Sequence, residues 1–236
     1  MNINIFNTQI EMIKKVAEAL GGELLNEVAF VGGCTTGLLV TDEFTKESIR
    51  YTNDVDLIIH VIGHSNWTKF QKRLREHGFK ASPTNDFICR MCLGDLEVDF
   101  MPDDSTLGFT NRWYPRAFQT AQNYFLTETI TIKLITPPYF VATKLEAYND
   151  RGNNDPLSSH DLEDILNLFD GRETIVDEIS LAENNLHIYV AGELKKLLKH
   201  RDFQYLVQST TKGNSGRAQI IFERLETVIK NADIQK

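Results

Sequence analysis

The sequence has few cysteines and no long hydrophobic run. Three cysteines in 236 residues are an odd number, which argues against a disulfide framework and favours a reducing cytoplasm. No apolar stretch approaches the roughly 20 residues that a membrane-spanning helix needs. The first residues, Met-Asn-Ile-Asn-Ile-Phe, lack the charged and then apolar pattern of a secretory signal. We therefore expect a cytoplasmic protein with no membrane partner.

An excess of positive charge is also missing. Lys and Arg total 25 against 33 Asp and Glu, which gives a net charge of −8. This balance argues against a nucleic-acid-binding protein that acts through its overall charge, but it leaves a local basic groove open. The hydrophobic content of 42% and the charged content of 25% are ordinary for a globular protein, with one large domain or two small ones.

Two of the cysteines have C-x-x-C spacing. Cys89 and Cys92 lie within a predicted strand, and no second pair accompanies them. Zinc sites normally take four ligands. We therefore interpret both as core or half-buried thiols rather than as zinc ligands.

An acidic pair begins the stretch Asn-Asp-Val-Asp-Leu-Ile-Ile-His-Val at residues 53–61. β-branched and apolar residues follow without a breaker, which predicts a strand. Because side chains alternate along a strand, Asp54 and Asp56 share one face. Two such carboxylates repel each other unless a cation lies between them, and hard oxygen ligands suit Mg²⁺. An isolated D-x-D is also found as a polar strand entrance, so the neighbouring segments decide between the two interpretations.

The upstream segment is a short apolar run that ends in Gly-Gly. Residues 29–31 are followed by Gly32, Gly33 and small residues that include Thr35 and Thr36. This pattern is typical of a strand that enters a helix or a tight turn. Glycine lets backbone N–H groups approach an anion closely, and a helix N-terminus adds a favourable dipole.

The downstream segment predicts a hairpin. Residues 87–93 and 96–101 are apolar-rich runs separated by Gly94-Asp95, a pair that suits a type II′ turn. Glu97 and Asp99 share one face of the second strand. Asp99 is then placed to face the carboxylates of a neighbouring strand, whereas Glu97 better fits a solvent-facing edge.

Strands and helices alternate in the first part of the chain. We predict helices over 8–20 and 66–77, strands over about 28–32 and over 129–135, a polar loop over 41–52, and irregular structure over 102–124. The fold class is α+β, with a mixed sheet flanked by helices over residues 1–136 and a helical C-terminal domain over 137–236.

The helix after Pro137-Pro138 carries a lysine on its apolar side. Lys144 shares that side with Val141 and Leu145, so it either extends to solvent or serves an anionic ligand. Asp161 is either the capping-box residue that follows Ser158 or a functional carboxylate.

Basic residues recur near the C-terminus. They are the best candidates for contact with RNA or an acidic partner, although an ordinary charged helix surface explains them as well: Lys195, Lys196, Lys199 and Arg201.

These motifs together resemble the nucleotidyltransferase superfamily of polymerase beta. Gly-Gly after a strand, D-x-D in a second strand and a single Asp in a third carry the resemblance. Residues 142–148, Arg151 and residues 159–165 are similar to the "K-L-x-A … R … D-x-x-D" pattern of the AbiEii/AbiGii-type and MenT-like enzymes of toxin–antitoxin and defence systems. The resemblance covers residues 25 to 170. The stretch from Gly33 to Asp54 is longer than in that family, so residues 41–52 form an insertion.

The resemblance implies a palm-like sheet and a Mg²⁺-dependent transfer of a nucleoside monophosphate from a nucleoside triphosphate to an acceptor hydroxyl. Asp54, Asp56 and Asp99 would hold one or two Mg²⁺ ions. The further implied site residues are Gly32, Gly33, Thr35, Thr36 and Lys144 for the nucleotide, and Lys144 and Asp161 in catalysis. The implied partners are tRNA or another RNA as acceptor and an antitoxin protein. The alternatives are a non-catalytic binding or regulatory protein of the same fold, and a hydrolase that uses the same cluster.

Overall fold

The chain forms two compact units, which we call the sheet unit and the helical unit. The computed structural model describes residues 5–60, 63–82, 88–105, 108 and 110–234. The sheet unit comprises Met1–Thr35 and Arg50–Thr136, and the helical unit comprises Thr36–Ile49 and Pro137–Lys236. The architecture is α+β, with a mixed sheet flanked by helices, as the sequence predicts.

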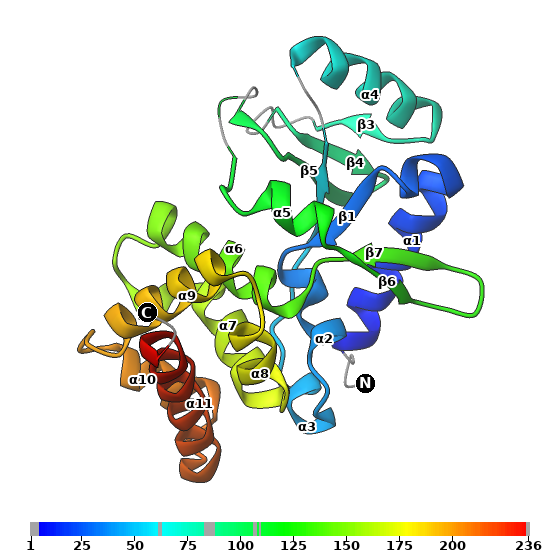
Figure 1. Ribbon diagram of the computed structural model, residues 1–236. Helices are drawn as coiled ribbons and strands as arrows, with labels where there is room; N and C mark the ends of the chain where they lie inside the picture. The colour runs from blue at the N-terminus through cyan, green and yellow to red at the C-terminus, as the bar shows by residue number, and fades with distance from the viewer. Residues whose placement is uncertain (1–4, 61–62, 83–87, 106–107, 109, 235–236) are drawn as a thin grey trace. The chain divides into compact units, whose positions relative to one another are not determined.

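Seven strands form the sheet within the described residues, in the order β3-β4-β5-β2-β1-β7-β6 (Figure 1). They are β1 (Val28–Val31), β2 (Asp54–Ile59), β3 (Lys80–Ala81), β4 (Arg90–Leu93), β5 (Leu96–Pro102), β6 (Gln122–Phe125) and β7 (Thr131–Leu134). Strand β2 is antiparallel to β1 and parallel to β5, and β1 is parallel to β7. The strand with the D-x-D motif is therefore central, with a neighbour on each side.

Aromatic side chains pack on one face of the sheet at Phe100 of β5. The helices of the sheet unit are α1 (Ile5–Leu25), η1 (Gly33–Thr35), α4 (His64–Glu76) and α5 (Tyr114–Gln119). Phe70 of α4 makes an edge-to-face contact with Phe100 of β5, with ring centroids 5.8 Å apart. The end of α1 meets α4, where Arg73 donates hydrogen bonds to Glu23 of α1 and to Glu27, which follows that helix. Since side chains alternate along a strand, Asp99 lies on the opposite face from Phe100.

The helical unit is built from helices in the described residues (Figure 1). They are α2 (Thr36–Leu39), α3 (Glu43–Lys46), α6 (Pro137–Arg151), η3 (Pro156–Ser158), α7 (His160–Gly171), α8 (Ile175–Ser180), α9 (Asn184–Leu197), α10 (Phe203–Thr210) and α11 (Ser215–Ile234). Helix α6 packs on α7 and α9, and α11 packs on α7, α8 and α9. Phe140 and Phe169 are fully buried there and contribute much of the core.

The segment predicted as the polar loop 41–52 belongs partly to the helical unit and contains a helix. Asp42 caps α3 by accepting a hydrogen bond from the Thr45 backbone N–H at 2.9 Å. The Thr41 and Asp42 backbone N–H groups donate to the Gly171 carbonyl, both at 2.9 Å. Arg217 of α11 then binds Asp42 and Asp170, each at 2.7 Å. These contacts explain why residues 36–49 group with the C-terminal helices rather than with the predicted core 1–136.

The irregular structure predicted over 102–124 is wrong in part. It contains α5, with a proline in its first turn and Ala117 buried, and the start of β6. Strand β6 is mostly exposed and pairs only with β7 at the edge of the sheet. An edge strand of this kind has no apolar alternation, which explains why the sequence pattern did not reveal it.

Helix boundaries also differ from the predictions by a few residues. Helix α1 is longer than 8–20 and continues past a break at Gly21, where φ is +66°. Helix α4 begins two residues before the predicted 66–77. The predicted hairpin is present, with Leu93 paired with Leu96 and Gly94 at a φ of +64°, as the first position of a type II′ turn requires. Its predicted first residue, Phe87, lies outside the described residues.

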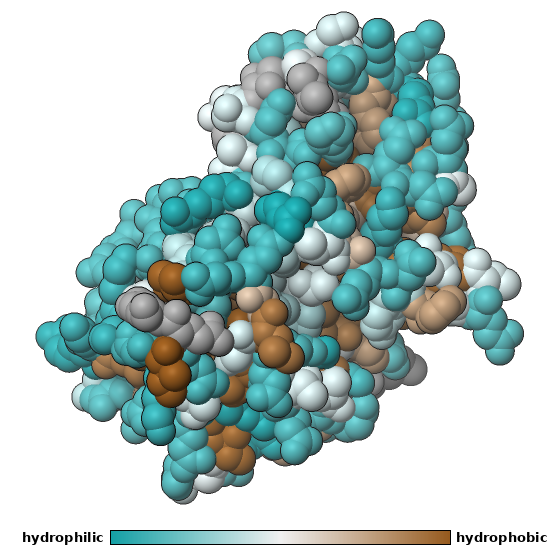
Figure 2. Space-filling model, viewed as in Figure 1, coloured by the Kyte–Doolittle hydropathy of each residue, from teal (hydrophilic) through white to brown (hydrophobic). Residues whose placement is uncertain are grey.

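Figure 2 shows one face that is mostly hydrophilic, with scattered hydrophobic residues. Exposed apolar side chains of this kind are normal on folded proteins. Among the described residues, no helix combines the length and hydropathy needed to cross a membrane.

Candidate metal centre and the ion pairs of the helical unit

Parallel pairing of β2 with β5 brings the three predicted carboxylates together. Asp56 is the direct partner of Asp99 across the two strands, and Asp54 is the partner of Glu97. Period-2 alternation places Asp54, Asp56 and Asp99 on one face. Each offers a carboxylate oxygen, and these three oxygens lie within 4.8 Å of one another. The predicted cluster is therefore present, with Asp99 buried and the other two partly exposed.

Arg90 of β4 neutralises part of this charge. The hairpin register places Arg90 directly opposite Asp99. Its Nε donates to Oδ1 of Asp99 and its Nη2 to Oδ2, both at 2.7 Å, and its Nη1 donates to Glu97 at 2.7 Å. Its Nη2 also lies 3.7 Å from Asp54. The hydrogen bonds to Asp99 raise the pKa of Arg90 above its usual value, so the guanidinium stays charged.

A divalent cation is compatible with this arrangement. Each oxygen of an ionised carboxylate has two lone pairs, so Asp99 can accept from Arg90 and still ligate a metal. Within this group of five side chains, four carboxylates face one guanidinium, which leaves an excess of negative charge. Closely spaced carboxylate oxygens are the donor set that Mg²⁺ prefers. Asp54, Asp56 and Asp99 therefore fit the metal that the sequence motif implies.

Arg90 is the residue that the motif analysis missed. The sequence contained a signal for Arg90, because a two-residue loop at Gly94-Asp95 fixes which residues of the two hairpin strands face each other. That register pairs Leu93 with Leu96 and, three steps further, Arg90 with Asp99. Continuing the register across the predicted hairpin would have placed the guanidinium beside Asp99.

Gly32 lies against the carboxylate of Asp56. The φ of Gly32 is +80°, and a Cβ atom at this position would lie 1.8 Å from Oδ2 of Asp56 and 2.7 Å from its Cβ. Only glycine permits both this backbone conformation and this approach. The predicted role of Gly-Gly in bringing backbone close to the site is consistent with this contact.

The two threonines after Gly-Gly have buried side chains. The Thr35 hydroxyl donates to the Gly32 carbonyl at 2.8 Å and closes the turn. Thr36 is only 1% exposed. The expected helix after the turn consists of η1 and the four-residue α2, so a large helix dipole is missing here. Gly33 is also buried.

A second cluster of charges lies inside the helical unit. The Lys144 ammonium donates to Asp164 at 2.7 Å and to Asp161 at 3.1 Å. Arg151 donates to Asp161 at distances of 3.1 and 3.2 Å. Lys, Arg and both aspartates of the K … R … D-x-x-D pattern therefore meet in one ion-pair network. Lys144 neither extends to solvent nor stands alone, because its side chain is 8% exposed and contacts two carboxylates.

Burial and neighbouring charges shift the pKa of Asp161 in opposite directions. Burial would raise the pKa of Asp161, but the charges and hydrogen bonds of Lys144 and Arg151 bring it below the ordinary value. Asp161 is not the capping residue that pairs with Ser158, since Ser159 caps α7 by accepting from the Leu162 backbone N–H. Asp161 and Lys144 belong to the helical unit, whereas the three carboxylates belong to the sheet unit.

The structure also places the two C-x-x-C cysteines and the basic residues near the C-terminus. Cys89 is buried and Cys92 is partly buried, and burial raises the pKa of the Cys89 thiol to about 12. Among the C-terminal basic residues, Lys195 pairs with Asp233, Lys196 with Glu193 and Arg201 with Asp202. Local carboxylates thus balance most of the predicted basic surface.

No protein-family model matches the chain, and comparison with curated protein sequences finds no match.

Replacing Gly32 with alanine should destabilise the protein. The new Cβ would overlap Asp56, and φ at this position is unfavourable for any other residue, so we expect a loss of about 2 kcal/mol or more in the free energy of unfolding. Urea denaturation measures this loss. Gly22→Ala is the matched control, because no atom lies within 4 Å of the position that its new methyl group would take, and it should leave stability nearly unchanged. Equal stability of Gly32→Ala and the wild type would contradict the close approach.

Asp161 should contribute stability that acid removes. Because its pKa is lower in the folded state, its contribution is complete above the unfolded value of about 4 and falls as the pH drops through the folded value. Asp161→Asn should cost about 2 to 4 kcal/mol at pH 7. The difference from wild type should shrink below about pH 4. Urea denaturation from pH 3 to 7 tests this, with exposed Asp150→Asn as control. A difference that is independent of pH would refute the ion-pair account.

Proposed function

We propose that the protein is a Mg²⁺-dependent nucleotidyltransferase with a palm-like sheet of the polymerase-beta type. The observation that carries the proposal is the carboxylate cluster: oxygens of Asp54, Asp56 and Asp99 lie within 4.8 Å on one face. The strand connections support it, because a Gly-Gly strand is antiparallel to the D-x-D strand, which is parallel to the third carboxylate strand.

In this proposal the acceptor hydroxyl oxygen attacks the α-phosphorus of a nucleoside triphosphate. A new phosphorus–oxygen bond forms, the bond to the β-phosphate oxygen breaks, and pyrophosphate leaves. The hydroxyl proton passes to a carboxylate or to solvent. Mg²⁺ held by Asp54, Asp56 and Asp99 would supply charge stabilisation at the attacking and leaving oxygens.

The chain's own residues position these groups. Arg90 fixes the orientation of Asp99 through two hydrogen bonds, so Asp99 is suited to orienting an acceptor hydroxyl. Gly32 brings backbone against Asp56, and the turn at Gly32 and Gly33 would offer N–H groups to the outer phosphates. Thr35 and Thr36, which are buried, would shape this turn rather than touch the nucleotide.

Among the basic residues of the K … R … D-x-x-D pattern, Arg151 reaches solvent and Lys144 does not. The Arg151 side chain is 72% exposed although it binds buried Asp161, whereas Lys144 is enclosed by Asp161 and Asp164. We assign Lys144 and Asp161 the role of holding Arg151 in place. The proposed acceptor is RNA, with the 3′ end of tRNA as the first choice, and the proposed context is a toxin–antitoxin or defence system in the cytoplasm.

One observation favours a second candidate, a non-catalytic protein of the same fold that binds or regulates a partner. Arg90 already supplies a positive charge to Asp99, Glu97 and Asp54. If this guanidinium serves in place of a metal, the cluster is structural. The two candidates differ in whether the cluster binds a divalent cation.

The test incubates the protein with each labelled nucleoside triphosphate, Mg²⁺ and total bacterial RNA. Transfer of label to RNA should occur with the wild type. Asp56→Ala should reduce the rate at least about 1,000-fold, or about 4 kcal/mol in barrier, because a metal ligand is lost. Asp95→Ala, which removes an exposed carboxylate from the adjacent turn, should retain activity.

Retained transfer by a folded Asp56→Ala protein would rule out the metal assignment. Absence of transfer by the wild type, together with absence of Mg²⁺-dependent nucleotide binding, would favour the non-catalytic candidate. Circular dichroism and urea denaturation establish that each variant is folded.

A further inference from the structure

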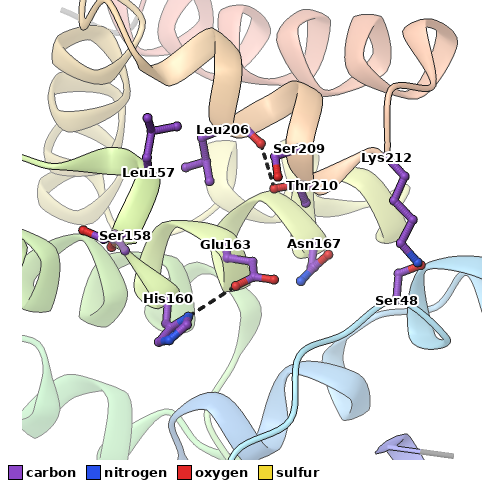
Figure 3. A pocket seen from close by; sticks show the side chains of 11 residues that line it. Ser48, Leu157, Ser158, His160, Glu163, Asn167, Leu206, Ser209, Thr210 and Lys212 are labelled. Atoms are coloured by element: carbon purple, nitrogen blue, oxygen red, sulfur yellow. Dashed lines mark hydrogen bonds and ion pairs between the residues drawn. The ribbon is translucent and has the colours of Figure 1, made fainter.

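The helical unit contains a polar cavity of about 210 Å³ that the proposed function does not use. Three segments line it: Ser48 after α3, residues 157–167 of η3 and α7, and residues 206–212 of α10 and the turn that follows. Figure 3 shows these side chains around the cavity. A water molecule takes about 30 Å³ in the liquid, so the space equals roughly seven waters or one small organic molecule.

A buried amide group lines this cavity without a hydrogen-bond acceptor. Asn167 of α7 is 2% exposed, and its Nδ2 atom has no partner among the described residues. A buried N–H donor that stays unpaired costs free energy. Its position on the wall of a roomy cavity therefore points to an acceptor atom of a ligand.

A cation lies on the same wall. Lys212 follows α10, and its ammonium donates to the Ser48 hydroxyl at 3.1 Å. In the part of the chain that the structure describes, Lys212 has no carboxylate partner. Its φ of +52° belongs to the turn that ends α10, where the Gly213 backbone N–H donates to the Gln208 carbonyl. The ammonium, the Asn167 amide and the nearby Ser209 hydroxyl form a group suited to a phosphate, whereas the Thr210 hydroxyl already donates to the Leu206 carbonyl at 3.0 Å.

A carboxylate lies about one helical turn from Asn167 along the same helix, α7 (Figure 3). It belongs to Glu163, which lines the cavity and accepts a long hydrogen bond of 3.4 Å from His160. A carboxylate repels a second anionic group but accepts hydrogen bonds from hydroxyls. The apolar side chains of Leu157 and Leu206 complete the lining. The cavity therefore combines donors at Asn167 and Lys212 with an acceptor about one helical turn away, at Glu163.

We propose that this cavity binds a small sugar monophosphate, with the phosphate at Asn167 and Lys212 and the sugar hydroxyls at Glu163. A triphosphate fits less well, because its additional charges would meet Glu163. A free pentose phosphate and the same group within a nucleoside monophosphate share this chemistry. All residues of this site belong to the helical unit, whereas the carboxylate cluster belongs to the sheet unit.

Isothermal titration calorimetry of the full chain with ribose 5-phosphate tests the proposal, with AMP and unphosphorylated ribose in separate titrations. We expect ribose 5-phosphate or AMP to bind and ribose to bind much more weakly. Lys212→Met and Asn167→Leu should each weaken binding by roughly tenfold to a hundredfold, since each removes a charged or buried hydrogen bond.

Lys199→Met is the matched control, because it removes an exposed lysine of the same unit that does not line the cavity. Lys212→Met keeps the wild-type core, so it remains informative if Asn167→Leu fails to fold. Equal affinity in the wild type and in Lys212→Met would overturn the proposal. So would absence of binding by both phosphate compounds at millimolar concentration.

Discussion

The parallel pairing of β2 with β5 is the constraint on which the sheet unit depends. Its register sets Asp56 against Asp99, and strand alternation adds Asp54 to the same face. Like charges this close destabilise a fold unless a cation compensates them. Arg90 provides that compensation from β4, through a hairpin register fixed by the turn at Gly94. The carboxylates, the guanidinium and the turn therefore depend on one another.

The helical unit also holds carboxylates close together, and other cations compensate their charge. Lys144 lies between Asp161 and Asp164, and Arg151 approaches Asp161 from the solvent side. A buried ion pair of this kind is costly to break, because removing one partner leaves an uncompensated charge. In both units a cation thus holds carboxylates at a fixed spacing. The cavity around Asn167 differs, since its donor has no acceptor among the described residues.

Much of the sheet was predictable from the sequence, because its signals are local. Period-2 alternation places Asp54 and Asp56, and a Gly-first loop predicts the hairpin that carries Asp99. The sequence analysis placed Asp99 toward the carboxylates of a neighbouring strand, but the parallel direction of that pairing is a long-range feature that it did not predict. Strand β6 and helix α5 have weak apolar patterns and were missed. Asp42 and Thr41 join the helical unit through Gly171 and Arg217, contacts that no local pattern reveals.

The most direct test of this account is a titration with Mn²⁺ followed by electron paramagnetic resonance, since Mn²⁺ takes the same oxygen ligands as Mg²⁺. The wild type should bind Mn²⁺, and Asp99→Asn, which removes a ligand charge and a partner of Arg90, should weaken binding at least about tenfold. Asp95→Asn, in the exposed turn beside the same strand, should bind as the wild type does. Equal Mn²⁺ binding by folded wild-type and Asp99→Asn proteins would contradict the assignment of the three carboxylates as a metal centre.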